Sequence, residues 1–354
     1  MKIVLLPTPL AEGWESMNHY WISLQQQFFD SKEVVSALGQ AHLGGAAKGR
    51  FARLLARVVV YPLKLRRFQS AEVFHILDHS YADLIRFVSE KARVLVTVHD
   101  LIPLTDESLL DASQRERFLK RVSFLRKADQ LVCVSQFTAS EVGRILDIPS
   151  EKMRVVPMGV DKEYLNVKGD ESPVFNVPSG RKPLLVVGSS IPRKNLSILP
   201  EILRQLPEDE YAVVKVGQKF PEDLAHQIRE ILGRDGLLEV GFVDADKLPL
   251  FYAQSFALIF PSLLEGFGLP VLEAMAAGCP VVCSDRASLP EVGGDCVIYF
   301  NPEEATGGAQ GLVKLAKDES FRKDLVQRAR VRAATMTWAH HADSLKNIYR
   351  DLMN

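Results

Sequence analysis

Short apolar runs recur along the chain between longer stretches in which apolar residues are spaced as on one face of a helix. The runs are predominantly apolar and do not alternate regularly with polar residues, which is typical of strands buried on both faces of a parallel sheet. The clearest runs predict strands at residues 3–6, 94–98, 130–134, 184–187, 212–216, 257–260 and 281–284. The pattern therefore predicts an α/β fold with doubly wound sheets that helices cover on both faces.

The alternation of strands and helices breaks once and then starts again. Beyond VVPMGVD, at residues 155–161, the segment NVKGDESPVFNVPSGRKP is rich in Gly, Pro, Ser and Asn and shows little periodicity. Such a segment is typical of a linker, and the apolar run LLVV follows it directly. We therefore expect Rossmann-like domains at residues 1–165 and 183–336, a linker at 166–182 and a C-terminal helix at 337–354.

Composition narrows the class of protein. The chain has 354 residues, of which 47% are hydrophobic and 25% charged, as in a globular protein. The start, MKIVLLPTPL, has the pattern of a first strand and not of a signal peptide, and no apolar run is long enough for a transmembrane helix. The four cysteines match no common zinc or redox spacing, so we expect buried thiols in a reducing cytoplasm.

Charge is unevenly distributed along the chain. The net charge of −1 gives no sign of nucleic-acid binding. Residues 1–160 hold 21 Lys and Arg against 17 Asp and Glu, a net of +4, and the remainder holds 22 against 27, a net of −5. A basic first half and an acidic second half indicate two domains with different tasks.

The segment FPSLLEGFGLPVLEAMAAGCPVVCSD, at residues 260–285, carries the clearest chemical signal. It predicts a strand, a glycine-containing loop, and a helix that ends at Gly278. Gly266 and Gly268 would let a ligand approach the backbone, and the amide groups at a helix start favour a diphosphate. Glu273, expected in the first helical turn, would accept hydrogen bonds from a ribose, and Glu265 would do so from a sugar. A nucleotide sugar contains a sugar, a diphosphate and a ribose in this order, which matches Glu265, the helix start and Glu273.

Two other interpretations of this segment remain. One is a capped surface helix with two solvated glutamates. The other is the carboxylate pair of a glycosidase, which in a retaining enzyme requires carboxyl groups about 5 Å apart. Nothing in the spacing of Glu265 and Glu273 requires that geometry, and it would leave the helix start without a ligand.

At this point the sequence resembles the retaining glycosyltransferases of family four, which have the GT-B fold. EGFGLPVLE matches the family's pair of glutamates, and further segments follow in the family's order: VHDLIPL, VSQFTASEV, VVPMGVD, VVGSSIPRKNLSIL and VGFVDADKLPLFYAQSFALIFPS. The resemblance implies two Rossmann-like domains that face each other across a cleft, with the acceptor on the first and the nucleotide sugar on the second. It also implies that the C-terminal helix crosses back to the first domain.

The resemblance assigns the donor contacts of the second domain. Arg193 and Lys194 lie between a strand and a helix, where their charges would stabilise a leaving diphosphate. Many family members have arginine at the position of Ser189, which shifts this role to Arg193. The implied donor-binding set of this domain is Arg193, Lys194, Gly217, Val243, Glu265, Gly266, Phe267, Gly268, Leu269 and Glu273.

The resemblance also assigns residues of the first domain. His99, at the end of a predicted strand, would face the cleft and act with Glu265 in catalysis, because histidine shares a proton near neutral pH. Gly13 and Ser16 resemble the family's first loop, beside the donor diphosphate. His79 and Ser80 follow the strand-like VFHIL, at the end of a strand where α/β proteins bind ligands, and are candidates for acceptor contact. A turn or capping role for the segment that contains them is the alternative.

A basic, amphipathic stretch lies in the first domain. Residues 42–71 contain no Asp or Glu and seven basic residues: Lys48, Arg50, Arg53, Arg57, Lys64, Arg66 and Arg67. Residues 115–127 form a second basic stretch, opposed only by Glu116. Such helices bind anionic membrane surfaces, although a solvated face over a core stripe has the same pattern. We expect an enzyme on the inner face of the cytoplasmic membrane, with a glycan or lipid-linked glycan as acceptor.

The resulting hypothesis is a hexosyltransferase of cell-surface polysaccharide or glycolipid synthesis that uses a UDP- or GDP-linked sugar. We expect no cofactor and no metal, because the chain lacks an Asp-x-Asp motif and has two cations near the diphosphate. The alternatives are a nucleotide-sugar epimerase on the same fold and a non-enzymatic protein that binds sugar nucleotides. A dehydrogenase is disfavoured, because no G-x-G-x-x-G follows the first strand.

Overall fold

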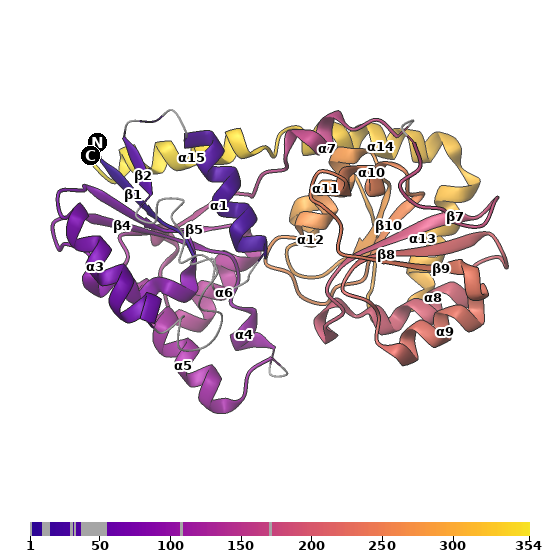
Figure 1. Ribbon diagram of the computed structural model, residues 1–354, viewed down its shortest axis with the longest axis horizontal. Helices are drawn as coiled ribbons and strands as arrows, with labels where there is room; N and C mark the ends of the chain where they lie inside the picture. Colours follow the sequence, from indigo (N-terminus) through magenta and orange to yellow (C-terminus); the bar gives the residue numbers. More distant parts are fainter. Residues whose placement is uncertain are drawn as a thin grey trace. The chain divides into compact units, whose positions relative to one another are not determined.

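The computed structural model of the protein describes residues 2–8, 15–28, 31, 33–36, 55–106, 109–169 and 172–354 (Figure 1). The chain divides into two compact units. The first comprises Met1–Gly159 and Trp338–Asn354, and the second comprises Val160–Thr337. The sequence placed the first domain boundary six residues later, after residue 165. Among the described residues, no helix combines the length and the apolar character that crossing a membrane requires.

The first unit contains a six-stranded parallel sheet in the order β2-β1-β3-β4-β5-β6. Its strands are β1 (Ile3–Leu6), β2 (Val34–Ser36), β3 (Val73–Ile76), β4 (Arg93–Val98), β5 (Gln130–Cys133) and β6 (Met153–Val155). Its α-helices are α1 (Glu15–Phe28), α3 (Tyr61–Leu65), α4 (Ile102–Thr105), α5 (Ala112–Val122), α6 (Gln136–Leu146) and α15 (Trp338–Asp351). Shorter 3-10 or π-helical segments are η2 (Ala56–Val60), η3 (Arg66–Phe68), η4 (His79–Phe87), η5 (Ser123–Lys127) and η6 (Ser150–Lys152).

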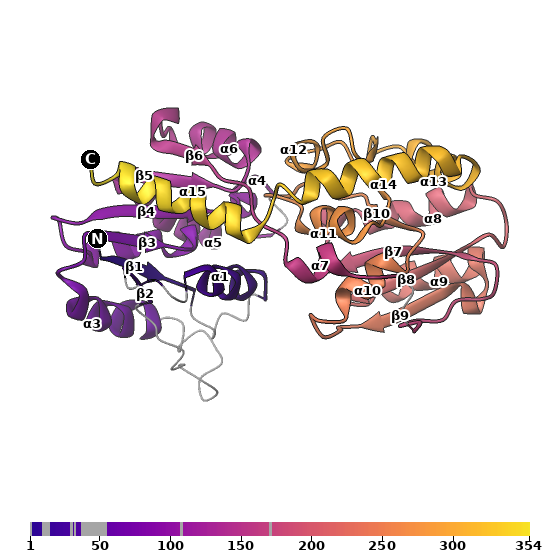
Figure 2. The same cartoon turned by 90° about the horizontal axis from the view of Figure 1, so that it is seen from above.

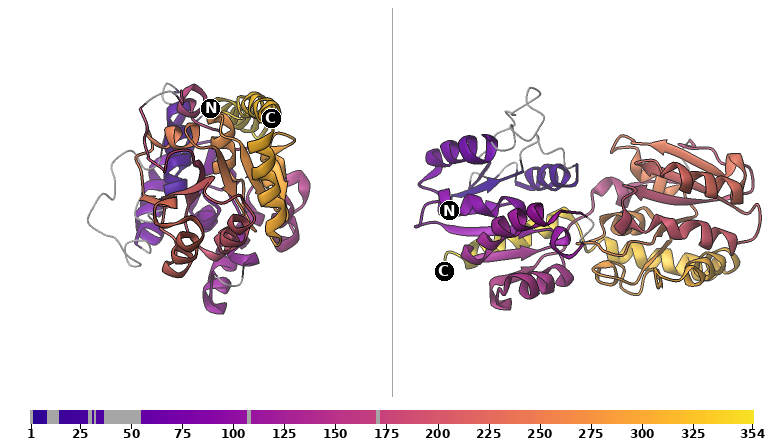
Figure 3. Two further views of the ribbon diagram at one scale, coloured as in Figure 1. Left: turned by 90° about the vertical axis from the view of Figure 1, so that its right-hand side faces the viewer. Right: turned by 90° about the horizontal axis from the view of Figure 1, so that it is seen from below.

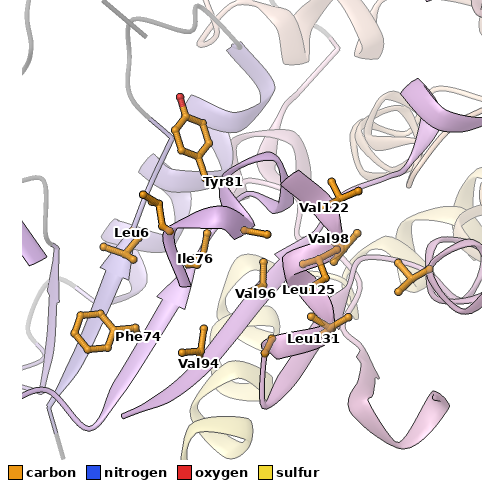
Figure 4. Close-up of a cluster of buried hydrophobic side chains, with 14 of the residues drawn as sticks. Leu6, Phe74, Ile76, Tyr81, Val94, Val96, Val98, Val122, Leu125 and Leu131 are labelled. Carbon is orange, nitrogen blue, oxygen red and sulfur yellow. The ribbon is translucent and has the colours of Figure 1, made fainter. Parts of the chain in front are cut away.

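Alternate residues of these strands face opposite sides of the sheet, which gives the unit two cores. On one side, Phe74, Ile76 and Val96 pack with residues of η4, α5 and α6 (Figure 4). On the other side lie α1 and α15, which contact each other although they come from opposite ends of the chain (Figure 2). Figure 3 shows α15 alongside the strands of this unit.

The second unit contains a second six-stranded parallel sheet, in the order β12-β11-β10-β7-β8-β9. Its strands are β7 (Lys182–Gly188), β8 (Tyr211–Gly217), β9 (Leu237–Gly241), β10 (Ala257–Phe260), β11 (Val281–Ser284) and β12 (Ile298–Phe300). Its α-helices are α7 (Lys162–Asn166), α8 (Leu199–Arg204), α9 (Glu222–Leu232), α10 (Leu248–Ala253), α11 (Leu269–Ala277), α12 (Leu289–Gly293), α13 (Ala305–Lys317) and α14 (Glu319–Ala333). Three 3-10 segments complete the unit: η7 (Pro192–Lys194), η8 (Leu196–Ile198) and η9 (Arg234–Gly236).

Helices lie on both faces of the second sheet, as Figure 1 shows: α8, α9 and α13 on one face, and α7, α10, α11 and α14 on the other. The strands β8, β10 and β11 are buried throughout, which explains why they lack alternation in the sequence, whereas β7, β9 and β12 include half-buried residues. The predicted α/β class with two Rossmann-like sheets is confirmed. Cys133, Cys279, Cys283 and Cys296 are buried thiols.

The segment that the sequence assigned to the linker packs against the second unit. Residues 167–181, apart from 170 and 171, which are not described, form no helix or strand. The amide of Val174 donates to the side-chain carbonyl of Gln254 at 3.0 Å, and the rings of Phe175 and Phe251 stack with centroids 5.5 Å apart. The segment is therefore anchored on α10 and on the residue that follows it.

Candidate active site

The second unit places two cations after the end of β7. The strand ends at Gly188, and Arg193 and Lys194 follow in the single turn η7. Asn195 then adopts left-handed backbone geometry, with φ of 52°, and its side chain donates to the carbonyl of Pro302 at 2.7 Å. This anchored turn fixes both cations at the carboxyl edge of the sheet, where α/β proteins bind ligands.

Both cations converge on Glu265, in the loop that follows β10. Lys194 Nζ lies 2.6 Å from one carboxylate oxygen of Glu265, and Arg193 Nη1 lies 3.0 Å from the other. Burial by itself would raise the pKa of Glu265, but the charges of Lys194 and Arg193 outweigh it and hold the pKa below its ordinary value. Glu265 is therefore ionised at neutral pH, and the cluster of three side chains carries a net charge of +1.

The loop from Glu265 to Gly268 leads directly into α11. The hydroxyl of Ser288 donates to the carbonyls of Glu265 and Phe267 at 2.9 and 2.8 Å and holds the loop closed. Gly268 has a φ of 102°, and an added Cβ would lie 2.6 Å from Leu289 Cδ2. The left-handed backbone geometry therefore favours glycine at this position, and any side chain would also displace the end of Leu289. Leu269 begins the helix, so the predicted donor residues from Glu265 to Leu269 form one continuous loop and helix start.

Glu273 lies deeper in α11 than the sequence indicated. It is the fifth residue of the helix and starts the second turn, because the helix begins at Leu269 and not later. Its carboxylate is buried and accepts a hydrogen bond from the hydroxyl of Tyr252 at 2.7 Å. Burial and the nearby Glu273 charge raise the pKa values of Tyr252 and Tyr164 well above the ordinary range, so both phenols remain protonated donors.

Two further predicted donor residues follow neighbouring strands. Gly217 ends β8 with a φ of 97°, and an added Cβ would lie 2.7 Å from the carbonyl oxygen of Gly188. Its glycine is explained by close packing against the end of β7. Val243 is half-buried just after β9, and the preceding Phe242 is 74% exposed.

In the first unit, His99 follows β4 and is buried. Its Nε2 lies 2.9 Å from the carbonyl oxygen of Leu77, so this nitrogen carries the hydrogen. Its Nδ1 is buried and has no hydrogen-bond partner among the residues that the structure describes. Burial is the largest influence on the pKa of His99 and lowers it, so the ring is neutral at pH 7 with Nδ1 as an open acceptor.

His79 and Ser80 begin η4, directly after β3, and both are buried. The ring centroids of His79 and His99 are 6.4 Å apart. Asp78 caps the segment: it accepts from the amide of Ser80 at 2.8 Å and from the hydroxyl of Thr8 at 3.0 Å. The capping role that the sequence left open thus belongs to Asp78, whereas the Ser80 hydroxyl is buried without a partner in the described part of the chain.

The remaining predicted residues of the first unit are less informative. Ser16 is exposed in the first turn of α1, and Gly13 lies outside the described residues. Lys48, Arg50 and Arg53 of the predicted basic stretch also lie outside them. Arg57 does not belong to the solvated basic face: its guanidinium donates to the carbonyl of Ser80 at 2.8 Å and lies over the ring of Tyr81.

Sequence reasoning missed several residues that shape these sites. Ser288 lies outside the segments that carry the family resemblance, and Tyr252 lies in one of them without a role of its own; only the folded chain brings both to the glutamates. Lys215 is different, because a single lysine inside the apolar run AVVKV is visible in the sequence. In the structure this lysine is fully buried, and its amino group reaches the carbonyl of Gly188.

Comparison with protein families gives two matches that together span most of the chain. A family described as "Glycosyl transferases group 1" matches residues 167–332. A family described as "Glycosyltransferase Family 4" matches residues 25–164. The two matches correspond to the second and first units of the structure, respectively.

The chain is also similar to individual proteins. The O-antigen chain mannosyltransferase B of Escherichia coli is 28% identical over 384 aligned positions, which cover 99% of this chain and 100% of that protein. Among solved structures, a sucrose-phosphate synthase from Thermosynechococcus elongatus has a TM-score of 0.78 at 18% identity, with 100% and 99% of the two chains covered. The Anabaena protein HepE, in complex with UDP and glucose, has a TM-score of 0.76 at 16% identity, with 99% of both chains covered. These structural likenesses establish a shared fold.

Proposed function

Because the chain belongs to the glycosyltransferases of family four, we propose that its second unit binds the nucleotide diphosphate sugar and that transfer retains the anomeric configuration. The protein is a hexosyltransferase of polysaccharide synthesis. The alternatives of an epimerase and of a non-enzymatic sugar-nucleotide-binding protein are thereby set aside.

The contact of Arg193 and Lys194 with Glu265, beside the start of α11, is the observation that carries this proposal. Two cations, a helix N-terminus and a glycine-containing loop lie together at the carboxyl edge of the sheet. Together they suit the two negative phosphates of a nucleotide sugar. Glu265 holds the cations in place before the donor binds, and its carboxylate would accept hydrogen bonds from hydroxyl groups of the donor sugar.

In the proposed reaction, an acceptor hydroxyl forms a bond to the anomeric carbon while the bond from that carbon to the diphosphate breaks. The electron pair of the broken bond goes to the departing phosphate oxygen, and the acceptor hydroxyl gives up its proton, which the departing phosphate takes up. Negative charge therefore grows there, and Arg193 and Lys194 stabilise it more strongly in the transition state than in the ground state. Since two cations serve this purpose, we expect the reaction to proceed without a metal ion or cofactor.

His99 is proposed to hold a hydroxyl group near the reacting carbon. Its Nε2 hydrogen is committed to the carbonyl of Leu77, so only Nδ1 remains to accept a hydrogen bond. A sugar hydroxyl is a donor of the right kind for this buried acceptor, because an unpaired buried acceptor costs free energy. His79 and Ser80, at the same edge of the first sheet, are proposed acceptor contacts.

The similarity to O-antigen chain mannosyltransferase B favours mannose as the transferred sugar. The base remains a choice between guanine and uracil, and exposed Phe242, beside Val243, would offer it a stacking surface. The acceptor is proposed to be a growing glycan, either free or lipid-linked.

A location on the inner face of the cytoplasmic membrane is proposed from the surface of residues 55–68. Leu55, Val58, Val59 and Leu63 are 43%, 49%, 41% and 53% exposed. Arg66 and Arg67 are exposed on the next turn. Exposed apolar and cationic side chains on one short helical segment suit the interface of an anionic bilayer.

The test is a transfer assay with purified protein, GDP-mannose, UDP-glucose and UDP-galactose, and a lipid-linked mannosyl acceptor, followed by mass spectrometry and NMR of the product. We expect one donor to be consumed, one hexose to be added, the α or β configuration of the donor to persist, and activity to survive EDTA. Inversion at the anomeric carbon would refute retention. Loss of activity in EDTA that Mg²⁺ or Mn²⁺ restores would refute the metal-free mechanism.

A further inference from the structure

Lys215 lies in the middle of β8, whose residues are all buried. It has no exposed surface, although a charged ammonium group is costly to bury without compensation. Its Nζ donates to the carbonyl of Gly188 at 2.6 Å and to the carbonyl of Val216 at 3.2 Å. Replacing a buried charge with an apolar side chain is often neutral or stabilising, so stability alone gives little reason for a lysine here.

The bond to Gly188 connects this lysine to the donor loop. Gly188 is the last residue of β7, and Arg193 and Lys194 follow five and six positions later. The same carbonyl accepts from the amide of Gln218 at 3.2 Å, and the side chain of Gln218 accepts from the amide of Ser190 at 3.1 Å. The end of β8 thus holds the start of the donor loop through Lys215 and Gln218.

The positive charge of Lys215 is not neutralised by a carboxylate that pairs with Lys215 alone. The charged groups that face it are Lys194 of η7 and Glu239 of β9. Glu239 already accepts from Arg229 at 2.9 Å and from the amide of Phe220 at 2.9 Å. Lys194 and Arg193 share Glu265. Among the described residues of this cluster, the four cations Arg193, Lys194, Lys215 and Arg229 are thus matched by the two carboxylates of Glu265 and Glu239, and the excess of positive charge favours an anionic ligand.

We propose that Lys215 is a positioning residue for the donor diphosphate, which fixes the Gly188 turn, adds a third positive charge beneath the donor loop and takes up a proton when the diphosphate binds. This inference rests on the proposed donor site. Burial, opposed by the charge of Glu239 and assisted by that of Lys194, lowers the pKa of Lys215 to about 8. A nearby diphosphate favours the ammonium form, so part of the population binds a proton along with the ligand.

The test is calorimetric titration of the whole protein with GDP and UDP between pH 7 and 9.5, in pairs of buffers with different ionisation enthalpies. For the wild type, we expect proton uptake near pH 8.5 and an affinity that falls as the pH rises above 8, by about tenfold for each unit of pKa shift. K215M should bind about tenfold more weakly at pH 7, take up no proton near pH 8.5 and lose the alkaline decline.

Further variants separate the charge from the hydrogen bond. K215Q keeps a donor for the Gly188 carbonyl but has no charge, so it should fold and still lose the proton uptake. K215R keeps the charge, so at pH 7 it should bind the nucleotide more tightly than K215M does. Because arginine stays charged, its affinity should not decline at pH 9. K182M is the matched control: Lys182 pairs with Glu210 at 2.8 Å at the opposite end of β7, and its loss should change neither affinity nor proton uptake.

The outcomes distinguish the two levels of the proposal. Binding of GDP or UDP with wild-type affinity and wild-type proton uptake in folded K215Q would overturn the role of Lys215 and leave the donor site intact. Failure of the folded wild type to bind either nucleotide at any pH would overturn the donor site, and the role of Lys215 with it.

Discussion

Glu265 is the residue on which the donor cluster depends, because it gives Arg193 and Lys194 a common partner. Its pKa is lowered although burial opposes this, so its charge persists throughout the neutral range. Burying a carboxylate together with two cations costs desolvation free energy. Binding of an anionic ligand by the two cations gives this buried cluster a function. The net positive charge of the cluster favours binding of a second anion, which would compete with Glu265 for Arg193 and Lys194.

The first prediction concerns these two cations. We expect R193M and K194M to lower kcat by about 100-fold or more, because the contact with the leaving phosphate is strongest in the transition state. The accompanying loss in the free energy of unfolding should be smaller than the loss in activation free energy. Steady-state kinetics and urea denaturation of the same preparations check this.

K323M is the matched control, since Lys323 forms an exposed ion pair with Glu319 on α14. It should leave both quantities unchanged. Wild-type turnover in both R193M and K194M would show that the turn is a surface feature and would refute the leaving-group role.

A second prediction separates two interpretations of Glu273. If the carboxylate binds a ribose, E273Q should weaken donor affinity by about 1–3 kcal/mol, the usual cost of losing a hydrogen bond to a charged group. If Glu273 only anchors Tyr252, then Y252F should have the same effect, because it removes that bond and leaves the carboxylate in place. Calorimetric titration with the donor nucleotide compares the variants. Equal affinity of E273Q and wild type would exclude Glu273 from the donor site.

At the scale of elements, α15 docks on the first sheet through a buried polar network. His75 of β3 lies 2.7 Å from the hydroxyl of Tyr349 and 2.8 Å from that of Thr97. His341 lies 3.0 Å from the hydroxyl of Tyr20 and 2.8 Å from the carbonyl of Pro157. The last helix is thus tied to β3, to α1 and to the segment beyond β6, all within one unit.

This network predicts a pH dependence of stability. Burial lowers the pKa of His75 to about 3 and that of His341 to about 4. The unfolded chain, with histidine pKa values of about 6.5, therefore binds protons that the folded chain does not. Stability should be constant with respect to these groups above pH 7 and should fall progressively as the pH decreases from about 6.5 toward 4.

Urea denaturation at pH 7.5, 6, 5 and 4 measures the effect. H341Q should reduce the acid slope, whereas H226Q, at an exposed position on α9, should not change it. An acid slope that is the same in H341Q and in the wild type would show that this network does not control the stability of the folded chain.

At the scale of the whole molecule, positive charge is concentrated in the first half of the chain and negative charge in the second. The structure refines this pattern, because Arg57 is turned inward and Arg66 and Arg67 stand beside exposed apolar side chains. Each Lys or Arg near an anionic surface contributes about 1 kcal/mol, so a few residues give reversible binding. Salt should weaken it, because exposed charges are screened beyond about 8 Å at physiological ionic strength.

We therefore predict that the protein co-sediments with phosphatidylserine-containing vesicles at low salt. It should not co-sediment with them at high salt, or with neutral vesicles. R66E/R67E and V58S/L63S should each reduce binding severalfold. K317E/K323E, which makes the same charge change on the second unit, should bind as the wild type does. Equal sedimentation of R66E/R67E and wild type would locate any membrane contact elsewhere.

The sequence by itself determined the fold class, the strands with the clearest apolar runs, and the loop and helix start at Glu265–Leu269; it did not single out β2, β6, β9 or β12. Apolar runs such as those at 257–260 and 281–284 appear as β10 and β11 with the same bounds, because a strand buried on both faces needs apolar side chains throughout. The family motif from Glu265 to Glu273 depends on glycines and on a helix start, which are local features of the chain. Local signals of this kind are readable without knowing what lies opposite them.

The tertiary structure decided which side chains meet, because contacts between distant segments depend on the register and packing of whole elements. Glu265 and Lys194 are 71 positions apart, and only the adjacency of β7 and β10 brings them to 2.6 Å. The same holds for His75 and Tyr349, which are 274 positions apart. It also holds for Lys215: the sequence shows a lysine inside an apolar run, but only pairing with β7 and β9 shows that it is buried and bonded to Gly188, before the donor loop. Periodicity specifies which face of an element is buried, whereas pairing of the strands specifies the partner.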